Sequence, residues 1–214
     1  MTNSESFSSP FPSAAQRQRD RESKRDAVLK AAVLLFNDKG FHATSVDDIA
    51  QALGVTKPVI YHYIGSKDQV LFHCVEAGLS QLLGAAEKSH EIAGNGRERL
   101  AAFLNLYAEI IMDDFGACVI RTSEEQLSPE SRIHFRALKR KVDEAIRRHV
   151  AEGVADGSVE TDNVALAAAT AAGAINWTAR WFDPEGPLDR SAMADFIVNQ
   201  LMFGLVPRDK LTEI

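Results

Sequence analysis

The eight residues 56–63 (TKPVIYHY) bring together side chains that suit contact with nucleic acid. On a helix over this segment, the side chains of Lys57, Tyr61 and His62 would face outward. Several aromatic rings exposed on one short helix are unfavourable in water unless a partner covers them. The segment therefore predicts a surface that binds DNA. Without such a contact, His62 would be an ordinary surface residue.

Positive charge is concentrated around this segment. The whole chain is acidic, with 24 Lys and Arg against 30 Asp and Glu, but residues 16–67 contain nine basic and six acidic residues. A basic stretch directly precedes the first predicted helix and comprises Arg17, Arg19, Arg21, Lys24 and Arg25. Such a stretch can follow the phosphates or enter the minor groove, and Lys67 lies where a helix N-terminus can hold a phosphate. Any DNA-facing surface must therefore lie in the N-terminal third.

Apolar residues at helical spacing define the elements that would position these side chains, and no stretch alternates at the period of a strand. Glycines and N-capping residues mark the helix ends, as Gly40 and the capping box at residues 66–69 illustrate. We predict an all-α fold of nine helices. In chain order these are 24–39, a short helix between Thr44 or Ser45 and Gly54, one from Thr56 to Tyr63, 66–88, 98–113, 117–126, 129–155, 161–182 and 189–205.

Residues 44–67 combine short amphipathic helices with a Gly-containing turn, which is the helix-turn-helix pattern. Six apolar side chains would form the small core that sets the angle between the helices, namely Ile49, Ala50, Leu53, Val55, Ile60 and Ile64. The alternative is an αα-corner within a larger helical bundle, with no role in DNA binding. The flanking basic residues favour the DNA-binding interpretation.

Residues 24–71 resemble the DNA-binding domain of the TetR (tetracycline-repressor-like) family. The resemblance is carried by LFNDKGF at 35–41, TSVDDIA at 44–50, GVTK at 54–57, YHY at 61–63 and SKD at 66–68. It implies phosphate contacts by Thr44, Tyr61, His62 and Lys67, and an approach to base edges by Lys57, Val59 and Tyr63. Ser45, Thr56 and Pro58 complete the predicted DNA-binding set. The chain departs from the family at Pro58, Ile64 and Gly65, and in having His62-Tyr63 where Tyr-His is usual; these changes bear on the operator sequence and not on the fold.

The C-terminal helices predict an interface between two copies of the chain. The helix over 161–182 is rich in alanine, and the last helix adds Met193, Phe196 and Phe203. The family resemblance implies a ligand-binding and dimerisation domain, in which the last two helices of each subunit form a four-helix interface. The alternative is that both helices pack only within the monomer.

A ligand cavity is the second expectation for this half of the chain. Apolar and aromatic residues at helical spacing are more often plain core, but together they are able to line a cavity. The candidates of this kind are Phe72, Phe103, Tyr107, Met112, Phe115 and Cys118.

The stretches 153–157 and 176–186 are similar to TetR-family regulators of fatty-acid, sterol and aromatic-acid catabolism, many of which sense acyl-CoA thioesters. An arginine between two tryptophans suits a phosphate or a stacked base, so Trp177, Arg180 and Trp181 join the ligand candidates. The alternative is that the two tryptophans pack in the dimer core while Arg180 pairs with a carboxylate.

Several classes of function are excluded. The chain has no Gly-rich phosphate loop, zinc-ligand spacing or nucleophile elbow, and the neighbours His73 and Cys74 would point about 100° apart on a helix. We therefore expect no enzyme, no cofactor and no metal. Cys74 and Cys118 lack the density of a disulfide framework and are predicted to be buried thiols. With no signal peptide and no apolar stretch of spanning length, we expect no membrane association and a cytoplasmic location.

These observations predict three segments, a disordered basic-ended arm over 1–20, a helix-turn-helix domain over 21–66, and a ligand-binding and dimerisation domain over 67–214. The predicted protein is a homodimeric repressor that a small-molecule effector, such as an acyl-CoA or a related catabolic intermediate, releases from a palindromic double-stranded DNA operator. Release would follow a ligand-driven movement of the fourth helix. The alternative is a TetR-like regulator of efflux or stress genes that senses an apolar compound.

Overall fold

The computed structural model describes residues 13–204, and this range contains nine α-helices, one 3₁₀ turn and no β-strand. The all-α prediction is confirmed. The elements are α1 (Ala14–Lys39), α2 (Val46–Ala52), α3 (Lys57–Tyr63), α4 (Lys67–His90), α5 (Gly96–Ile111), α6 (Asp114–Arg121), η1 (Glu124–Gln126), α7 (Pro129–Ala155), α8 (Val164–Thr178) and α9 (Arg190–Phe203).

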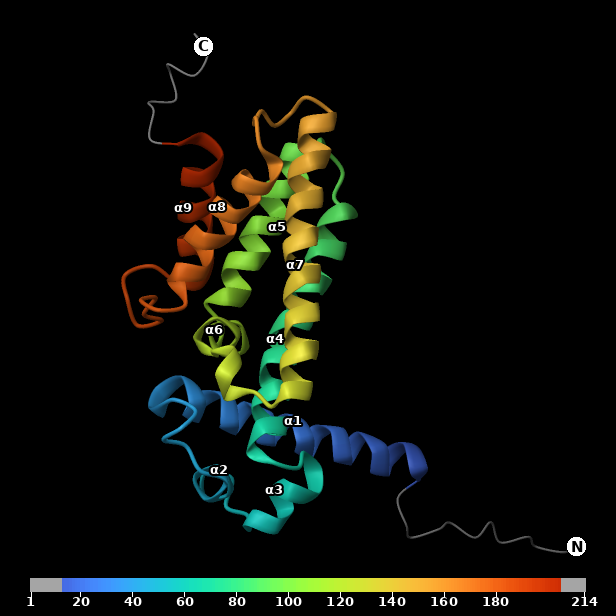
Figure 1. Ribbon diagram of the computed structural model, residues 1–214, viewed down its shortest axis with the longest axis vertical. Helices are drawn as coiled ribbons and strands as arrows, with labels where there is room; N and C mark the ends of the chain where they lie inside the picture. The colour runs from blue at the N-terminus through green and yellow to red at the C-terminus, as the bar shows by residue number, and fades with distance from the viewer. Residues whose placement is uncertain (1–12, 205–214) are drawn as a thin grey trace, which may run out of the picture.

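The helices form a small lower tier and a tall upper tier (Figure 1). The lower tier holds α1, α2 and α3, and the long helices α4 and α7 pack together along the upper tier. Helix α5 packs against α4, α7, α8 and α9, while α6 lies where the tiers meet and contacts α1, α4 and α5. Within residues 13–204, every helix is too short or too polar to cross a membrane. The division of the chain into 21–66 and 67–214 stays a prediction.

Helix α1 begins at Ala14 rather than at Lys24, because the segment before Lys24 has good helix formers even though it lacks an apolar stripe. Side-chain pairs one turn apart support it, as when the Gln16 amide donates to the Asp20 carboxylate over 2.9 Å. The predicted disordered arm over 1–20 is therefore wrong from Ala14 onward. The first twelve residues of that arm lie outside the described part of the chain.

Two predicted helices in the second half are shorter than expected. The helix predicted over 117–126 is in fact α6, which ends at Arg121, followed by the separate 3₁₀ turn η1, because Thr122 adopts an extended backbone (ψ 121°). Helix α8 starts after its N-cap at Asn163, whose side chain accepts from the Leu166 amide. Helix α8 ends at Thr178, four residues before the predicted end, and α6 starts at Asp114, three residues before the predicted start. The remaining helix ends agree with the predictions to within about two residues, the usual uncertainty of a helix boundary, except the start of α1.

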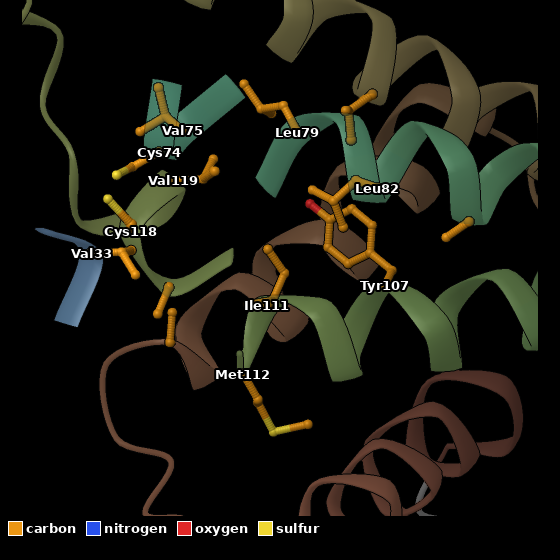
Figure 2. Packing of buried hydrophobic residues seen from close by; sticks show 14 of the residues in the cluster. Val33, Cys74, Val75, Leu79, Leu82, Tyr107, Ile111, Met112, Cys118 and Val119 are labelled. Carbon is orange, nitrogen blue, oxygen red and sulfur yellow. The ribbon is translucent and has the colours of Figure 1, made fainter. Parts of the chain in front are cut away.

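Helices α4 and α6 pack so closely where the two tiers meet that only small side chains fit between them. Gly78 of α4 faces α6 so closely that a Cβ atom there would lie 2.6 Å from the Phe115 carbonyl oxygen. One helical turn earlier, the thiols of Cys74 and Cys118 point toward one another between α4 and α6 (Figure 2). Both cysteines are buried free thiols, and burial raises the pKa of Cys118 to about 11, so neither thiol is a ready nucleophile.

Candidate nucleic-acid interface and ligand region

The angle between α2 and α3 is set by a small core and a tight turn. Ile49 of α2 and Ile60 of α3 are completely buried, as predicted. The turn between the helices needs Gly54, whose φ of +64° falls in the left-handed region that favours glycine. Val55 is 38% exposed and Leu53 is only partly buried, so the prediction that Val55 belongs to this core is wrong.

The face of α3 that turns away from this core presents the polar side chains of the predicted DNA-binding surface. Lys57, Pro58, Tyr61 and His62 are all exposed, and so is the N-cap residue Thr56, whose side chain makes no capping hydrogen bond. The structure therefore brings together the exposed part of the predicted set on one short helix. Its contact with DNA stays a prediction.

Lys57 is held in place by an acidic residue of the preceding helix. Its Nζ atom lies 2.9 Å from Oδ2 of Asp47, and both side chains face solvent. The hydrogen bond and the charge of Asp47 raise the pKa of Lys57, so the ammonium form is retained. Asp47, in the first turn of α2, therefore orients Lys57.

Thr44 is not available to a phosphate, which corrects its predicted role. Its side chain is 1% exposed, and its hydroxyl lies within hydrogen-bond distance of the carbonyls of Leu35, at 3.2 Å, and Gly40, at 2.9 Å. Thr44 thus joins the end of α1 to the start of α2. Its neighbour Ser45 caps α2 in a capping box with Asp48 and remains exposed.

Tyr63 and Val59 differ from the other members of the predicted set because both are partly buried. The Tyr63 ring packs against the core at the junction with α1, and the ammonium of Lys24 lies 5.9 Å from the ring centroid. Both residues line an apolar groove of about 640 Å³ between α1 and α3. Their predicted approach to base edges is therefore sterically limited, and that of Lys57 is not.

Lys67 opens α4 beside the helix-turn-helix. Its Nζ atom stands 4.2 Å from the centroid of the Phe41 ring, and the side chain is partly buried. Desolvation lowers the pKa of this ammonium group. A cation held at a helix N-terminus suits a phosphate, in agreement with the position predicted for Lys67.

The basic stretch forms the first turns of α1 and is not a separate arm. Arg17, Arg19, Arg21 and Lys24 are exposed. Arg25 differs, since its Nη2 atom lies 2.9 Å from Nδ1 of His73 on α4. The stretch therefore offers a preformed basic helix next to α3.

The predicted ligand residues do not converge on one site. Phe103, Tyr107, Met112 and Cys118 are buried in the core, and Figure 2 shows the Met112 side chain pointing away from the Cys118 thiol. Burial raises the pKa of Tyr107, and its hydroxyl donates to Oδ1 of Asn176 over 2.9 Å. These positions correspond to the core alternative.

Phe72 and Phe115 are half-buried at the edges of that core. Phe72 contacts the ring of His134 on α7, with ring centroids 6.0 Å apart, and Phe115 packs at the start of α6. They are distant in sequence and packed by different helices. Their predicted role in ligand binding stays a prediction.

The two tryptophans and Arg180 face outward. Trp177 is 63% exposed and Trp181 is 47% exposed, and Arg180 is also exposed. Leu166 on α8 and Phe196 on α9 are exposed apolar residues as well. The ligand-binding role of Trp177, Arg180 and Trp181 stays a prediction, and so does the alternative that the two tryptophans pack in a dimer core.

A cavity that the sequence did not predict lies between α5, α7, α8, α9 and the segment that follows α7. Its volume is about 730 Å³, and it contains one basic and one acidic side chain, Arg97 and Glu160. The apolar lining residues are Leu100, Leu104, Val150, Val159, Ala167, Ala171, Leu201, Met202 and Phe203. The helical spacing of these residues indicates that they share a face of each helix. A filled core has the same spacing, so the sequence alone does not distinguish a cavity wall from a filled core.

Comparisons with known proteins agree with this architecture. Residues 28–74 match the family model described as bacterial regulatory proteins, tetR family, and residues 93–205 match a tetracyclin repressor-like C-terminal domain. The chain is 30% identical over 169 residues to the HTH-type transcriptional repressor KstR2 of Mycolicibacterium smegmatis, in a match that covers 78% of this chain and 82% of that protein.

Solved structures show the same fold. The TetR family transcriptional regulator PfmR from Thermus thermophilus has a TM-score of 0.77 and 34% identity, and the match covers 84% of this chain and 99% of that one. AibR, solved in complex with isovaleryl coenzyme A and operator DNA, has a TM-score of 0.72 and 26% identity over 84% of this chain and 98% of that one. Because family models cover both halves and a relative of 30% identity spans most of the chain, this protein belongs to the TetR family of DNA-binding transcriptional regulators and is not an enzyme.

Proposed function

We propose that this protein is a homodimeric repressor that binds a palindromic operator through two copies of α3 and that a small-molecule effector releases from DNA. The observation that carries the proposal is the exposed polar face of α3, on which Lys57, Tyr61 and His62 stand together. The name of the similar protein KstR2 supports repression over activation. The protein would act in the cytoplasm, where its operator lies.

The dimer would form through α8 and α9. Leu166 and Trp177 on α8 and Phe196 on α9 are all more than half exposed, and the spacing of eleven residues puts Leu166 and Trp177 on one face of α8. Exposed large apolar side chains are unfavourable in water and suit a second copy of the chain, as in an isologous interface. A single helix-turn-helix has a small footprint, so two copies would be needed for affinity and register.

The effector would occupy the cavity between α5, α8 and α9. Its apolar wall suits a hydrocarbon group, and the guanidinium of Arg97 at its edge suits an anionic one. Together with the isovaleryl coenzyme A bound by AibR, this favours an acyl-CoA or a related intermediate. The second candidate is an apolar effector of efflux or stress regulation, which the largely apolar wall favours.

DNA binding can be tested by selection from a pool of random duplexes at low ionic strength, followed by a salt titration. We expect an enriched palindrome and a slope of log affinity against log salt of about −0.9 for each phosphate contacted. Lys57→Met should change the preferred base and leave the slope nearly unchanged, whereas Lys67→Ala should lower the slope by about one per subunit. A protein that enriches no duplex would contradict the proposed function.

The effector class can be tested on the same DNA complex with acyl-CoA thioesters of increasing chain length, free coenzyme A and an apolar dye. Release by a thioester and not by free coenzyme A supports the first candidate. Release by the dye alone supports the second. Ala171→Trp should fill the cavity and block release while the affinity for DNA is unchanged. An Ala171→Trp protein that binds DNA and is still released by the same effector would contradict an effector site there.

A further inference from the structure

The side chain of Arg121, at the end of α6, joins two helices that lie far apart in the sequence. Its Nε and Nη2 atoms donate to the Ala179 carbonyl at the end of α8, over 2.9 and 2.6 Å. Its Nη1 atom donates to the Asn37 carbonyl in the last turn of α1, over 3.0 Å. One guanidinium group therefore links the helix-turn-helix tier to the helix that carries the exposed tryptophans.

The two carbonyls are favourable partners for a cation. The last carbonyls of a helix lack the amide that would follow in the ladder, and they lie at the negative end of the helix dipole. Hydrogen bonds from a charged donor to such groups are about twice as strong as those between neutral groups. Arginine is suited to this position because its rigid planar fork presents separate donors to two carbonyls some distance apart, whereas lysine offers one compact ammonium group.

A second contact fixes the same part of α1 to α6. The Asn37 side-chain amide donates to the Asp114 carbonyl in the first turn of α6 over 2.8 Å. Helix α6 is itself held tightly, because a Cβ atom at Gly116 would collide with the backbone of Ile110 and Ile111. The end of α1 is thus held at both ends of a short, rigid helix, and Figure 1 shows α6 in this place above α1.

The other end of the link lies beside the proposed interface between subunits. Ala179 is buried and follows Trp177, whose ring is exposed on α8. A movement of α8 relative to the partner subunit would therefore act directly on the Ala179 carbonyl. From there, Arg121 connects directly to α1, against which α3 packs.

We propose that Arg121 is a positioning residue that transmits the placement of α8 to the helix-turn-helix and so sets the half-site spacing that the dimer accepts. The inference rests on the proposed dimeric function, and it adds a specific residue that determines operator geometry. Arg121 touches neither DNA nor effector. Its role is to keep the two copies of α3 at one separation.

The test uses the full-length protein and the variants Arg121→Met, which has similar length and no charge, and Arg121→Lys, which keeps the charge and loses the fork. Arg140→Met, an exposed arginine of α7, is the matched control. Affinity is measured on a series of operators in which base pairs are inserted or removed between the half-sites. Wild type and control should show one sharp optimum.

In Arg121→Met we expect a roughly tenfold loss at the optimal spacing and a flatter profile, with a smaller loss at neighbouring spacings. Arg121→Lys should lie between the two. A merely structural role would lower affinity equally at every spacing and would lower the melting temperature. An unchanged profile shape, or a uniform loss, would overturn the proposal.

Amide hydrogen exchange separates a failure of this inference from a failure of the proposed function. In Arg121→Met, exchange should rise near residues 37–44 and 179–183 and stay unchanged in α5. A wild-type protein that binds no duplex would contradict the proposed function. Unchanged exchange in the two segments would contradict the link itself, with or without DNA binding.

Discussion

The imidazole ring of His149 on α7 stacks against that of His90 on α4, with ring centroids 4.2 Å apart. His149 is completely buried, and the ring of Phe103 covers its other face at 4.5 Å. The Nδ1–H group of His149 donates to the Ala145 carbonyl over 2.8 Å, and Nε2 lies 2.7 Å from the Ser89 hydroxyl, which also donates to the Ala86 carbonyl over 2.8 Å. Burial between two rings favours the uncharged imidazole.

His149 should make the stability of the protein depend on pH. Burial lowers its pKa in the folded state below the ordinary value of 6.5, and His90 adds to this effect, while Glu152 opposes it. Protonation of His149 therefore favours the unfolded chain. The contribution of the neutral ring to stability is complete above pH 6.5, and it is lost as the pH falls from there through the lowered pKa. Thermal melts of wild type between about pH 8 and pH 5 should show this loss, and the melts of His149→Leu should show a smaller one. If the melting temperatures of wild type and His149→Leu fell equally with pH, His149 would not be the source of the pH dependence.

Two glycines of α4 should respond in opposite directions to alanine. Gly78→Ala would place a Cβ atom 2.6 Å from the Phe115 carbonyl oxygen and 2.8 Å from a methyl of Val119, so α6 must shift. We expect a loss of about 1–3 kcal/mol in the free energy of unfolding. Gly84→Ala meets no atom within 4 Å, and the helix propensity of alanine should stabilise it by about 0.5–1 kcal/mol. Chemical denaturation of the two variants measures both values, and a Gly78→Ala protein as stable as Gly84→Ala would refute the close approach.

The surface of α8 should be needed for dimer formation. Leu166→Arg places a charge in the proposed apolar interface, and we expect a roughly 100-fold rise in the dimer dissociation constant, with DNA affinity falling as a result. Ile133→Arg is the matched control, because Ile133 is 67% exposed on α7 and Leu166 is 64% exposed on α8. Analytical ultracentrifugation decides the matter. If Ile133→Arg dissociates the dimer and Leu166→Arg does not, the interface lies on α7.

Asp47 should restrain Lys57 and sharpen its choice of base. In Asp47→Asn the ion pair with Lys57 is lost, and a negative charge is removed from a surface that would approach phosphates. We expect affinity for random duplex DNA to rise roughly threefold to tenfold and discrimination between operator variants to fall. Glu87→Gln is the control, because it also removes one negative charge but lies about 30 Å along α4 from Lys67, the first residue of that helix. It should change neither value. Fluorescence anisotropy on operator and random duplexes compares the three proteins, and a tighter but equally selective Asp47→Asn would contradict the orienting role.

The helix-turn-helix could be predicted from the sequence because its determinants are local. The capping box of Ser66 and Gln69 and the burial of Ile49 and Ile60 follow from spacings of a few residues. Backbone capping and helical periodicity act over one or two turns, so a single sequence is enough to find them. The same rule failed before Lys24, where a helix without an apolar stripe has no periodic signal.

The roles of other residues were decided by contacts between distant segments. Thr44 has the residue type of a phosphate ligand, yet the carbonyls of the α1 end surround its hydroxyl and bury it. Trp177 has the residue type of a core, yet it lies on the surface because the face of α8 that is buried is the one that carries Ala168, Ala171 and Ile175.

Long-range links had no counterpart in the sequence pattern. Arg121 meets carbonyls 58 and 84 positions away, and the wall of the 730 Å³ cavity is drawn from four helices and a connecting segment. By itself, the sequence determined which segments become helices and which faces are apolar, because these depend on neighbours within a turn. Only the tertiary structure decided which apolar faces are filled, which enclose space and which remain exposed, because that depends on how whole helices pack against one another.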